Sequence, residues 1–166
     1  EPNDGAGVTR NDGAVLRMNI TATYDYLTRA RRDLWATLDG VPDELLARPL
    51  LEGTRFGCLK DLIFHIAEVE DGWINGDIRG GDMLQRAIPV LRDGGPSFAE
   101  IPLATLLDYW REVEEGTKAY LASITDADLA RIVPVDDWPE KQMTLDGLLW
   151  HVMIHEMRHT AQLCVL

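Results

Sequence analysis

Four segments of the chain repeat apolar residues at intervals of three and four, the spacing that places side chains on one face of an α-helix. These segments are approximately 20–38, 59–73, 103–124 and 145–163. Pro102 and Thr144 stand at the predicted starts of the last two, where proline and threonine are common helix initiators. No segment alternates apolar and polar residues as a strand does, so the sequence predicts an all-α domain built as a four-helix bundle.

The connection between the second and third segments is rich in residues that break helices. It runs from Asn75 to Glu100 and contains five glycines and two prolines. In helical bundles short loops force neighbouring helices to run antiparallel, whereas one long crossover lets two successive helices run parallel. We therefore expect a long crossover between helices two and three.

The two ends of the chain and its charge limit the possible roles. Residues 1–17 are rich in Gly, Asp and Asn and lack an apolar period, which predicts a flexible leader before a domain over residues 18–166. The formal net charge of −12 argues against partners such as nucleic acid or an anionic membrane surface. No apolar run is long enough to span a bilayer.

Two further composition features lead to expectations about location and surface. Cys58 and Cys164 are too few for a secreted disulfide framework, which favours a reducing, cytoplasmic location. In the first helical segment, Arg29, Arg31 and Arg32 form a basic cluster that we expect on the solvated outer face.

The last segment carries three of the four histidines, His151, His155 and His159, at intervals of four. At about 100° per residue they share an arc of about 80° with Leu148 and Val152, so we expect the imidazoles to point into the core. They are either core histidines bonded to carbonyls or carboxylates, or ligands of a shared metal ion. Because residues eight apart lie about 12 Å apart along a helix, one ion can take either of the two adjacent pairs.

The stretch from His155 to His159 also fits H-E-x-x-H, the metalloprotease pattern in which two histidines hold zinc and the glutamate, here Glu156, is the general base. Such proteases usually take a third ligand from further along the chain, and only seven residues follow His159. They also commonly place the helix beside a sheet, for which this sequence shows no strands. The protease interpretation is therefore a minor alternative.

From about residue 18 onward the sequence resembles the DinB/YfiT-like family, whose members are four-helix bundles with up-down-down-up topology. The resemblance rests on His65 within the stretch 62–66, followed by Trp73, and on a closing HxxxHxxQ pattern that ends at Gln162. The chain has Thr160-Ala161 where the family commonly has Arg-Gly before that glutamine.

The resemblance implies that His65, His155 and His159 hold a divalent metal, zinc or nickel by preference, with iron also reported among members. It also suggests a homodimer that acts on a small-molecule substrate. Three neutral histidines leave a metal at least one open position, where a water or a thiol can be activated. Family relatives include bacillithiol- and mycothiol-dependent S-transferases and a mycothiol-dependent maleylpyruvate isomerase, so thiol transfer is the favoured activity.

Two alternative functions remain at this point, a metal-dependent hydrolase and a non-catalytic, stress-related metal-binding bundle. Glu68, one turn after His65, and Glu156 are candidate acid/base groups. His151 and Gln162 are candidates to line the pocket or to orient the ligands. Cys58 lies roughly 10 Å along the helix from His65, too far to share its metal, so we expect any reacting thiol to come from a cofactor.

Overall fold

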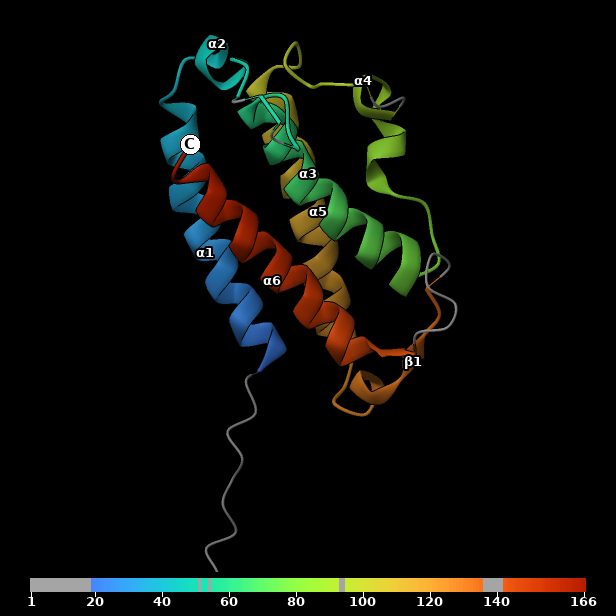
Figure 1. The fold of residues 1–166 in the computed structure, drawn as a ribbon. Coiled ribbons are helices and arrows are strands. Elements are labelled where there is room, and N and C mark those ends of the chain that lie inside the picture. Colours follow the sequence, from blue (N-terminus) through green and yellow to red (C-terminus); the bar gives the residue numbers. More distant parts are fainter. Residues whose placement is uncertain (1–18, 51, 54, 93–94, 136–141) are drawn as a thin grey trace, which may run out of the picture.

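The computed structural model describes residues 19–50, 52–53, 55–92, 95–135 and 142–166, and these residues are mainly helical (Figure 1). In chain order the elements are α1 (Ile20–Asp39), α2 (Asp43–Leu46), α3 (Leu59–Asp71), η1 (Gly72–Ile78), η2 (Leu84–Ala87), α4 (Pro89–Arg92), α5 (Leu103–Ser123), η3 (Asp128–Ala130), β1 (Ile132–Val133), β2 (Met143–Thr144) and α6 (Leu145–Leu163). The predicted helical class is confirmed. The exception is an antiparallel pair of two-residue strands, too short for any alternation to predict.

The long helices begin where the sequence predicts. Asn19 caps α1 by accepting a hydrogen bond from the Ala22 amide at 2.9 Å. Thr144 caps α6 by accepting one from the Gly147 amide at 3.2 Å, and Pro102 stands directly before α5. These caps satisfy amide groups that the first helical turn leaves without a partner.

The second long helix extends further than predicted. We expected the crossover to begin at Asn75, but α3 continues directly into the π-helical segment η1, which ends at Ile78. The Asn75 side chain donates to Asp71 at 2.8 Å and accepts from Arg79 at 2.6 Å, so it links successive turns across Gly76. These side-chain bonds support the helical segment despite its glycine.

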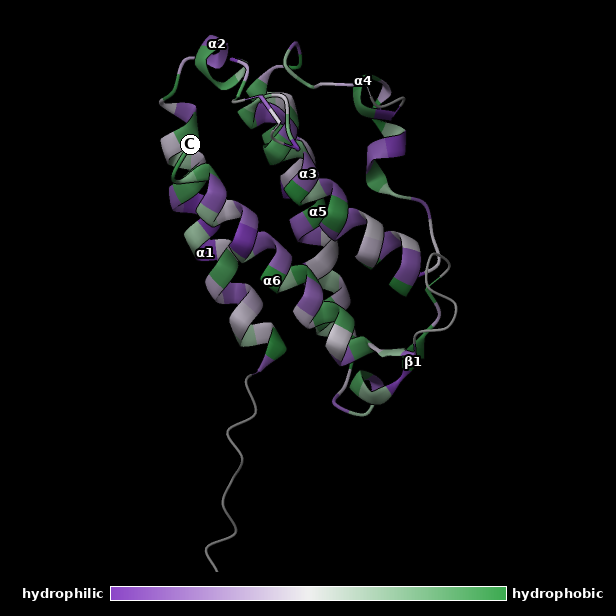
Figure 2. Cartoon of the chain, viewed as in Figure 1, coloured by the Kyte–Doolittle hydropathy of each residue, from purple (hydrophilic) through white to green (hydrophobic). Residues whose placement is uncertain are grey.

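The long helices pack through their apolar faces. Helix α1 contacts α5 and α6, and α3 also contacts α5 and α6. Figure 2 shows hydrophobic and hydrophilic bands alternating around these helices, as amphipathic packing requires. One buried cluster gathers around Trp110 and Leu62, and a second gathers around Ile74 and Leu148.

The prediction of a solvated basic cluster is wrong for Arg31. This side chain is buried, with 1% of the residue exposed, and it donates hydrogen bonds to Glu70 at 3.0 Å, Glu114 at 3.0 Å and Glu156 at 2.7 Å. The three carboxylates belong to α3, α5 and α6, so one guanidinium joins α1 to three other helices. The Tyr24 hydroxyl also donates to Glu70.

The helical period explains why Arg31 is buried. It lies four residues from both Leu27 and Trp35, so it occupies the apolar face of α1 rather than the face of its basic neighbours. Burial alone lowers its pKa, but the negative charges of Glu70 and Glu156 outweigh burial and raise the pKa above its ordinary value. Arg31 is therefore a charged group held in the interior by its partners.

The end of the crossover is fastened to the start of α3 by two buried side chains. Asp61 accepts hydrogen bonds from the Ser97 hydroxyl at 2.9 Å and the Phe98 amide at 2.6 Å. The Lys60 ammonium donates to two backbone carbonyls just before α5, both at 2.8 Å. These bonds hold the crossover against the helix that carries His65.

The predicted leader over residues 1–17 lies outside the described residues, as does the stretch 136–141 within the loop predicted before α6. Among the helices that the structure describes, none combines the length and the apolar character that crossing a bilayer requires.

Candidate metal centre

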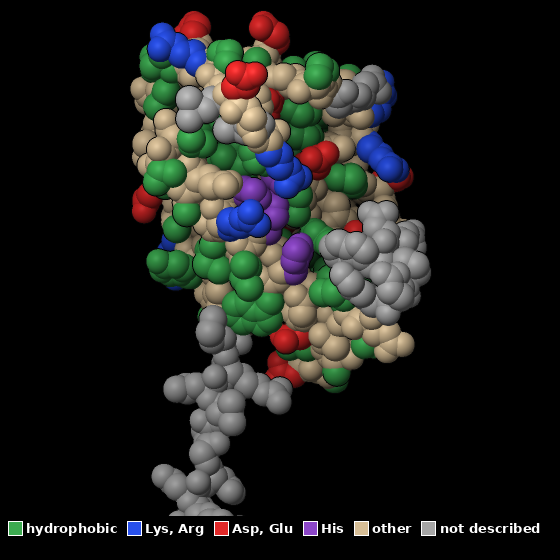
Figure 3. All heavy atoms as spheres, viewed as in Figure 1, with side chains coloured by type: hydrophobic (Ala, Val, Ile, Leu, Met, Phe, Trp, Pro, Cys, Tyr) green, Lys and Arg blue, Asp and Glu red, His purple; other side chains and the backbone are tan. Residues whose placement is uncertain are grey.

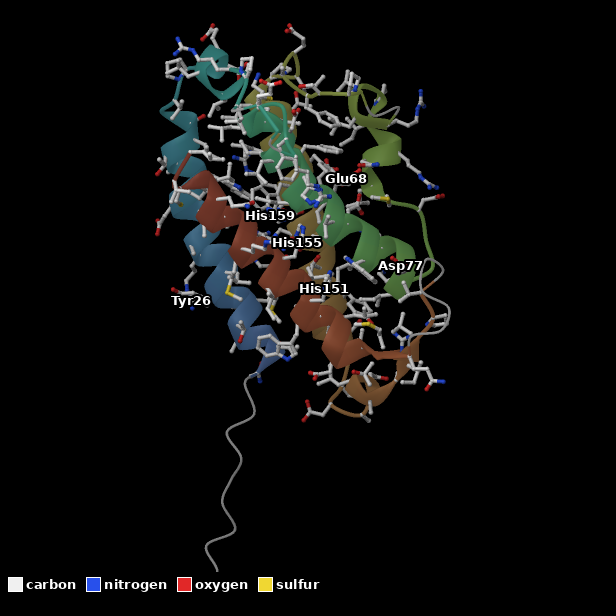
Figure 4. All side chains as sticks on the ribbon, in the orientation of Figure 1. Tyr26, Glu68, Asp77, His151, His155 and His159 are labelled. Carbon is white, nitrogen blue, oxygen red and sulfur yellow. The ribbon has the colours of Figure 1, made fainter. Side chains whose placement is uncertain are left out.

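Helix α6 carries two histidines one turn apart. His155 and His159 are four residues apart, so their side chains leave neighbouring positions on one face of the helix, and their ring centroids are 4.3 Å apart. His159 is 3% exposed and His155 is half-buried. Figure 4 shows both between α6 and α3.

His65, in the middle of α3, faces this pair. Its ring centroid lies 5.0 Å from that of His155 and 5.2 Å from that of His159. The Nε2 atoms of His65 and His155 are 3.2 Å apart, a separation that suits two nitrogens bound to one ion at about 2.1 Å each. One ligand nitrogen from each of the three rings lies within 4.8 Å of the others.

The structure thus brings together the three histidines that the family resemblance implied. Helical spacing alone allowed either His151 and His155 or His155 and His159 to share an ion. The structure favours the second pair, because His65 approaches His155 and His159. We call His65, His155 and His159 the histidine cluster. Its residues could hold a metal ion.

Polar side chains lie at the Nδ1 atoms of two of the three rings. Nδ1 of His159 donates to the Gln162 amide oxygen at 2.6 Å, and Nδ1 of His65 lies 3.8 Å from the Glu68 carboxylate. Both contacts favour a proton on Nδ1, which leaves the Nε2 lone pair free. Metal-bound histidines commonly use their second nitrogen in this way, so these partners fit a metal site.

The surroundings of the cluster lower the pKa of both of its imidazoles on α6, those of His155 and His159. Burial lowers the pKa of His155 to about 3, and the neighbouring rings of His159 and His65 act in the same direction. Burial also lowers the pKa of His159, although the bond to Gln162 opposes it. Because metal ions bind neutral imidazole, the lone pairs of this pair are available near neutral pH without the removal of a proton.

An aromatic ring that belongs to no sequence motif covers part of the cluster. The ring centroid of Phe56 lies 5.0 Å from that of His65 and 5.8 Å from that of His159. The loop before α3 positions it, and a hydrogen bond of 2.9 Å from the Leu50 amide to the Gly57 carbonyl closes this loop. No sequence pattern places a loop residue against a distant helix, so only the structure reveals this contact.

His151 does not join the cluster. It is exposed, its ring centroid lies 6.5 Å from that of His155, and it packs against Trp73 at 5.3 Å. The expectation that all three imidazoles of α6 point into the core is therefore wrong for His151. The histidines span about 80° of the helix circumference, and His151 lies at the solvent edge of that arc.

Glu156 occupies a different face of α6 from His155, about 100° around the helix axis. The residue is 5% exposed, and its carboxylate receives hydrogen bonds from Arg31 Nε at 2.8 Å and Nη2 at 2.7 Å. The H-E-x-x-H protease mechanism requires this glutamate to reach a metal-bound water. The structure instead places it in the ion cluster that joins α6 to α1.

The sequence of the chain also matches a known family. The model of the DinB superfamily matches residues 26–163. The chain belongs to the DinB superfamily. A solved structure of a conserved protein from Enterococcus faecalis is similar in fold, with a TM-score of 0.72, 17% sequence identity, and coverage of 90% of this chain and 95% of that chain. No curated protein matches the sequence.

The DinB match includes every residue of the histidine cluster and Gln162. The departure from the family pattern at Thr160-Ala161 leaves the adjacent contact intact, because Gln162 still accepts the hydrogen bond from His159. Cys58 is buried at the start of α3, with its sulfur 3.8 Å from the Ser97 hydroxyl oxygen. It is not among the residues grouped with the cluster.

Proposed function

We propose that this DinB protein is a metal-dependent enzyme that transfers a low-molecular-weight thiol, similar to bacillithiol or mycothiol, to a small electrophilic substrate. The observation that carries the proposal is the convergence of three imidazoles from α3 and α6, with ligand nitrogens within 4.8 Å. A divalent ion held there, zinc or nickel by preference and iron as an alternative, would keep an open position and lower the pKa of a bound thiol or water.

The protein's own groups supply orientation and proton transfer. Gln162 orients the ring of His159 through a hydrogen bond to its Nδ1, and the Glu68 carboxylate lies 3.8 Å from Nδ1 of His65. Glu68 is 39% exposed at its side chain, so its carboxylate can accept a proton from the reacting thiol and release it to solvent. The sulfur then bonds to the electrophilic carbon of the substrate, and the leaving group departs with its bonding electrons.

We assign Glu156 no proton transfer, because both of its carboxylate oxygens are bonded to Arg31. Its contribution is to position α6, which carries His155 and His159. His151 and Trp73 lie beside the cluster and are proposed to contact the substrate.

The first experiment measures metal content. Purified wild-type protein is expected to hold one divalent ion per chain, whereas His65→Ala and His159→Ala lose it because each removes one of three ligands. His151→Ala is the matched control and should retain the ion. Equal metal content in all four proteins would contradict the proposed ligands. Equal stability of metal-free wild type and the variants would favour a non-catalytic bundle.

The second experiment measures thiol transfer. Metal-loaded protein is mixed with a model electrophile such as monochlorobimane and with bacillithiol, mycothiol or glutathione in turn. The expected result is turnover that disappears on chelation and in the His155→Ala variant. Ester hydrolysis without any thiol transfer would assign the site to the alternative hydrolase, and an inactive but metal-loaded protein would contradict both.

The proposal extends to fold topology, assembly and location. The contacts of α1 and α3 with both α5 and α6 support the up-down-down-up bundle of the family.

Exposed apolar side chains on the adjacent helices α1 and α6, namely Tyr26, Ile154 and Met157, support a homodimer, which sedimentation analysis would test. Both cysteines are free, in keeping with a cytoplasmic location. The net charge of −12 argues against nucleic acid or an anionic membrane as partner.

A further inference from the structure

Two arginines flank the histidine cluster in a chain whose net charge is −12. Arg55 directly precedes Phe56, and its guanidinium carbon lies 5.3 Å from the centre of that ring. Phe56 in turn contacts His65 and His159. The second arginine, Arg158, directly precedes His159 on α6.

Helical spacing places Arg158 beside the cluster. It follows His155 by three residues and precedes Gln162 by four, so all three side chains lie on adjacent turns of the same side of α6. Figure 3 shows Lys and Arg side chains on either side of the histidines on this face of the molecule. The contact of Arg55 with Phe56 and the helical spacing of Arg158 thus place one arginine beside the cluster from the loop and one from α6.

Both arginines are exposed. Among the described residues, neither Arg55 nor Arg158 forms an ion pair, whereas the exposed Arg86 pairs with Asp82 at 2.7 Å. Within the part of the chain that the structure describes, no ion pair with a carboxylate therefore neutralises their charge.

This arrangement suits a small organic anion. A guanidinium offers a planar set of N–H donors that matches a carboxylate, and its charge makes these hydrogen bonds stronger than neutral ones. The surrounding protein is acidic and repels anions at long range, so an anionic substrate requires local positive charge at the site. Phe56 and Trp73 provide aromatic surface for the apolar part of the same molecule.

We propose that Arg55 and Arg158 bind the oxyanion of the substrate, so that the protein acts on small molecules that carry a carboxylate or a similar group close to their reacting atom. The placement of the reacting atom at the histidine cluster rests on the proposed metal-dependent function. The binding of the anion does not, because both arginines belong to the protein's own surface.

The test compares benzoate with its neutral analogue benzamide. Binding is followed by NMR titration of the backbone amides and arginine Nε–H groups, in zinc-loaded and in metal-free protein. The expected result is that benzoate binds about tenfold more tightly than benzamide in both forms. Arg55→Gln and Arg158→Gln should each weaken benzoate binding by about three- to fivefold, and the double variant should lose the preference.

Arg29→Gln is the matched control, because Arg29 is an exposed arginine on α1 and its removal should leave benzoate binding unchanged. A preference for benzoate that persists in the double variant would assign the anion to the metal or to another surface and overturn the proposal. Equal binding of benzoate and benzamide would also overturn it. Because the benzoate and benzamide titrations are also made with metal-free protein, they test the two arginines even if the histidine cluster binds no metal.

Discussion

Arg31 and Glu156 form a bidentate ion pair between α1 and α6, with Nε to Oε1 at 2.8 Å and Nη2 to Oε2 at 2.7 Å. Glu156 is the immediate neighbour of His155, so the pair fixes the part of α6 that presents the histidine cluster. The same guanidinium reaches Glu70 on α3, the helix that carries His65. The buried Arg31 side chain thereby links α3 and α6, the two helices that carry the histidine cluster.

Replacement of Arg31 by methionine should destabilise the fold strongly. Removing one partner from a buried ion pair leaves an uncompensated charge, which typically costs about 3–5 kcal/mol. Urea unfolding followed by circular dichroism measures the change in the free energy of unfolding. Arg29→Met, at an exposed position of the same helix, should change it by less than about 0.5 kcal/mol. Similar losses in the two variants would contradict the role of Arg31 in joining the helices.

In metal-free protein, the free energy of unfolding should decrease as pH falls from about 6.5 toward 3. The folded-state pKa of His155 is about 3, below that of a histidine in an unfolded chain. In this window the unfolded chain binds a proton that the folded protein does not, so acid favours unfolding. The stability contribution is therefore complete above the unfolded pKa and is lost on acidification.

Urea titrations at several pH values in the presence of a chelator measure this dependence. His155→Gln should show a shallower decrease than wild type, because the titrating group is gone. His151→Gln, at an exposed position of the same helix, should retain the wild-type slope. Identical slopes in wild type and His155→Gln would show that His155 does not drive the effect.

Replacement of Gln162 by leucine should weaken metal binding without unfolding the protein. The amide oxygen of Gln162 holds the Nδ1–H of His159, and loss of such a partner typically reduces metal affinity by about 10–100-fold. Competition with a chromophoric chelator measures the affinity. Gln162→Glu keeps an acceptor at this position and should bind metal more tightly than the leucine variant; the reverse order would argue against this role.

Replacement of Asp61 by alanine should loosen the attachment of the crossover to α3. Asp61 accepts hydrogen bonds from Ser97 and Phe98, and its loss leaves the half-buried Phe98 amide without this partner, at about 1–3 kcal/mol, whereas the exposed Ser97 hydroxyl can bond to water instead. Thermal unfolding measures the effect. Asp82→Ala, which removes an exposed ion pair with Arg86, should change stability by less than about 1 kcal/mol.

Apolar spacing predicts the long helices well, because the period of an α-helix is visible in any amphipathic segment. The cap at Thr144 and the start at Pro102 follow from local chemistry that neighbouring residues alone decide. The helical extension through Gly76 was missed, because its support comes from side-chain bonds of Asn75 that no propensity describes.

The buried ion cluster was also missed, although a signal for it was present. Each of its four charged members lies four residues from a buried apolar residue on its own helix: Arg31 from Leu27, Glu70 from Ile66, Glu114 from Trp110, and Glu156 from Val152. A charged residue on an apolar face indicates a buried partner of opposite charge. The sequence cannot say which helix supplies that partner.

The order of residues is enough to establish the helical segments and to place His155 on one face with both His151 and His159, because helical geometry converts sequence separation directly into position on one face. Which residues from other parts of the chain contact that face depends on the packing between helices. The contact of α3 with α6 brings His65 to the pair, Phe56 reaches them from a loop, and His151 is left at the solvent edge. These relationships join residues far apart in the chain, so no local pattern contains them.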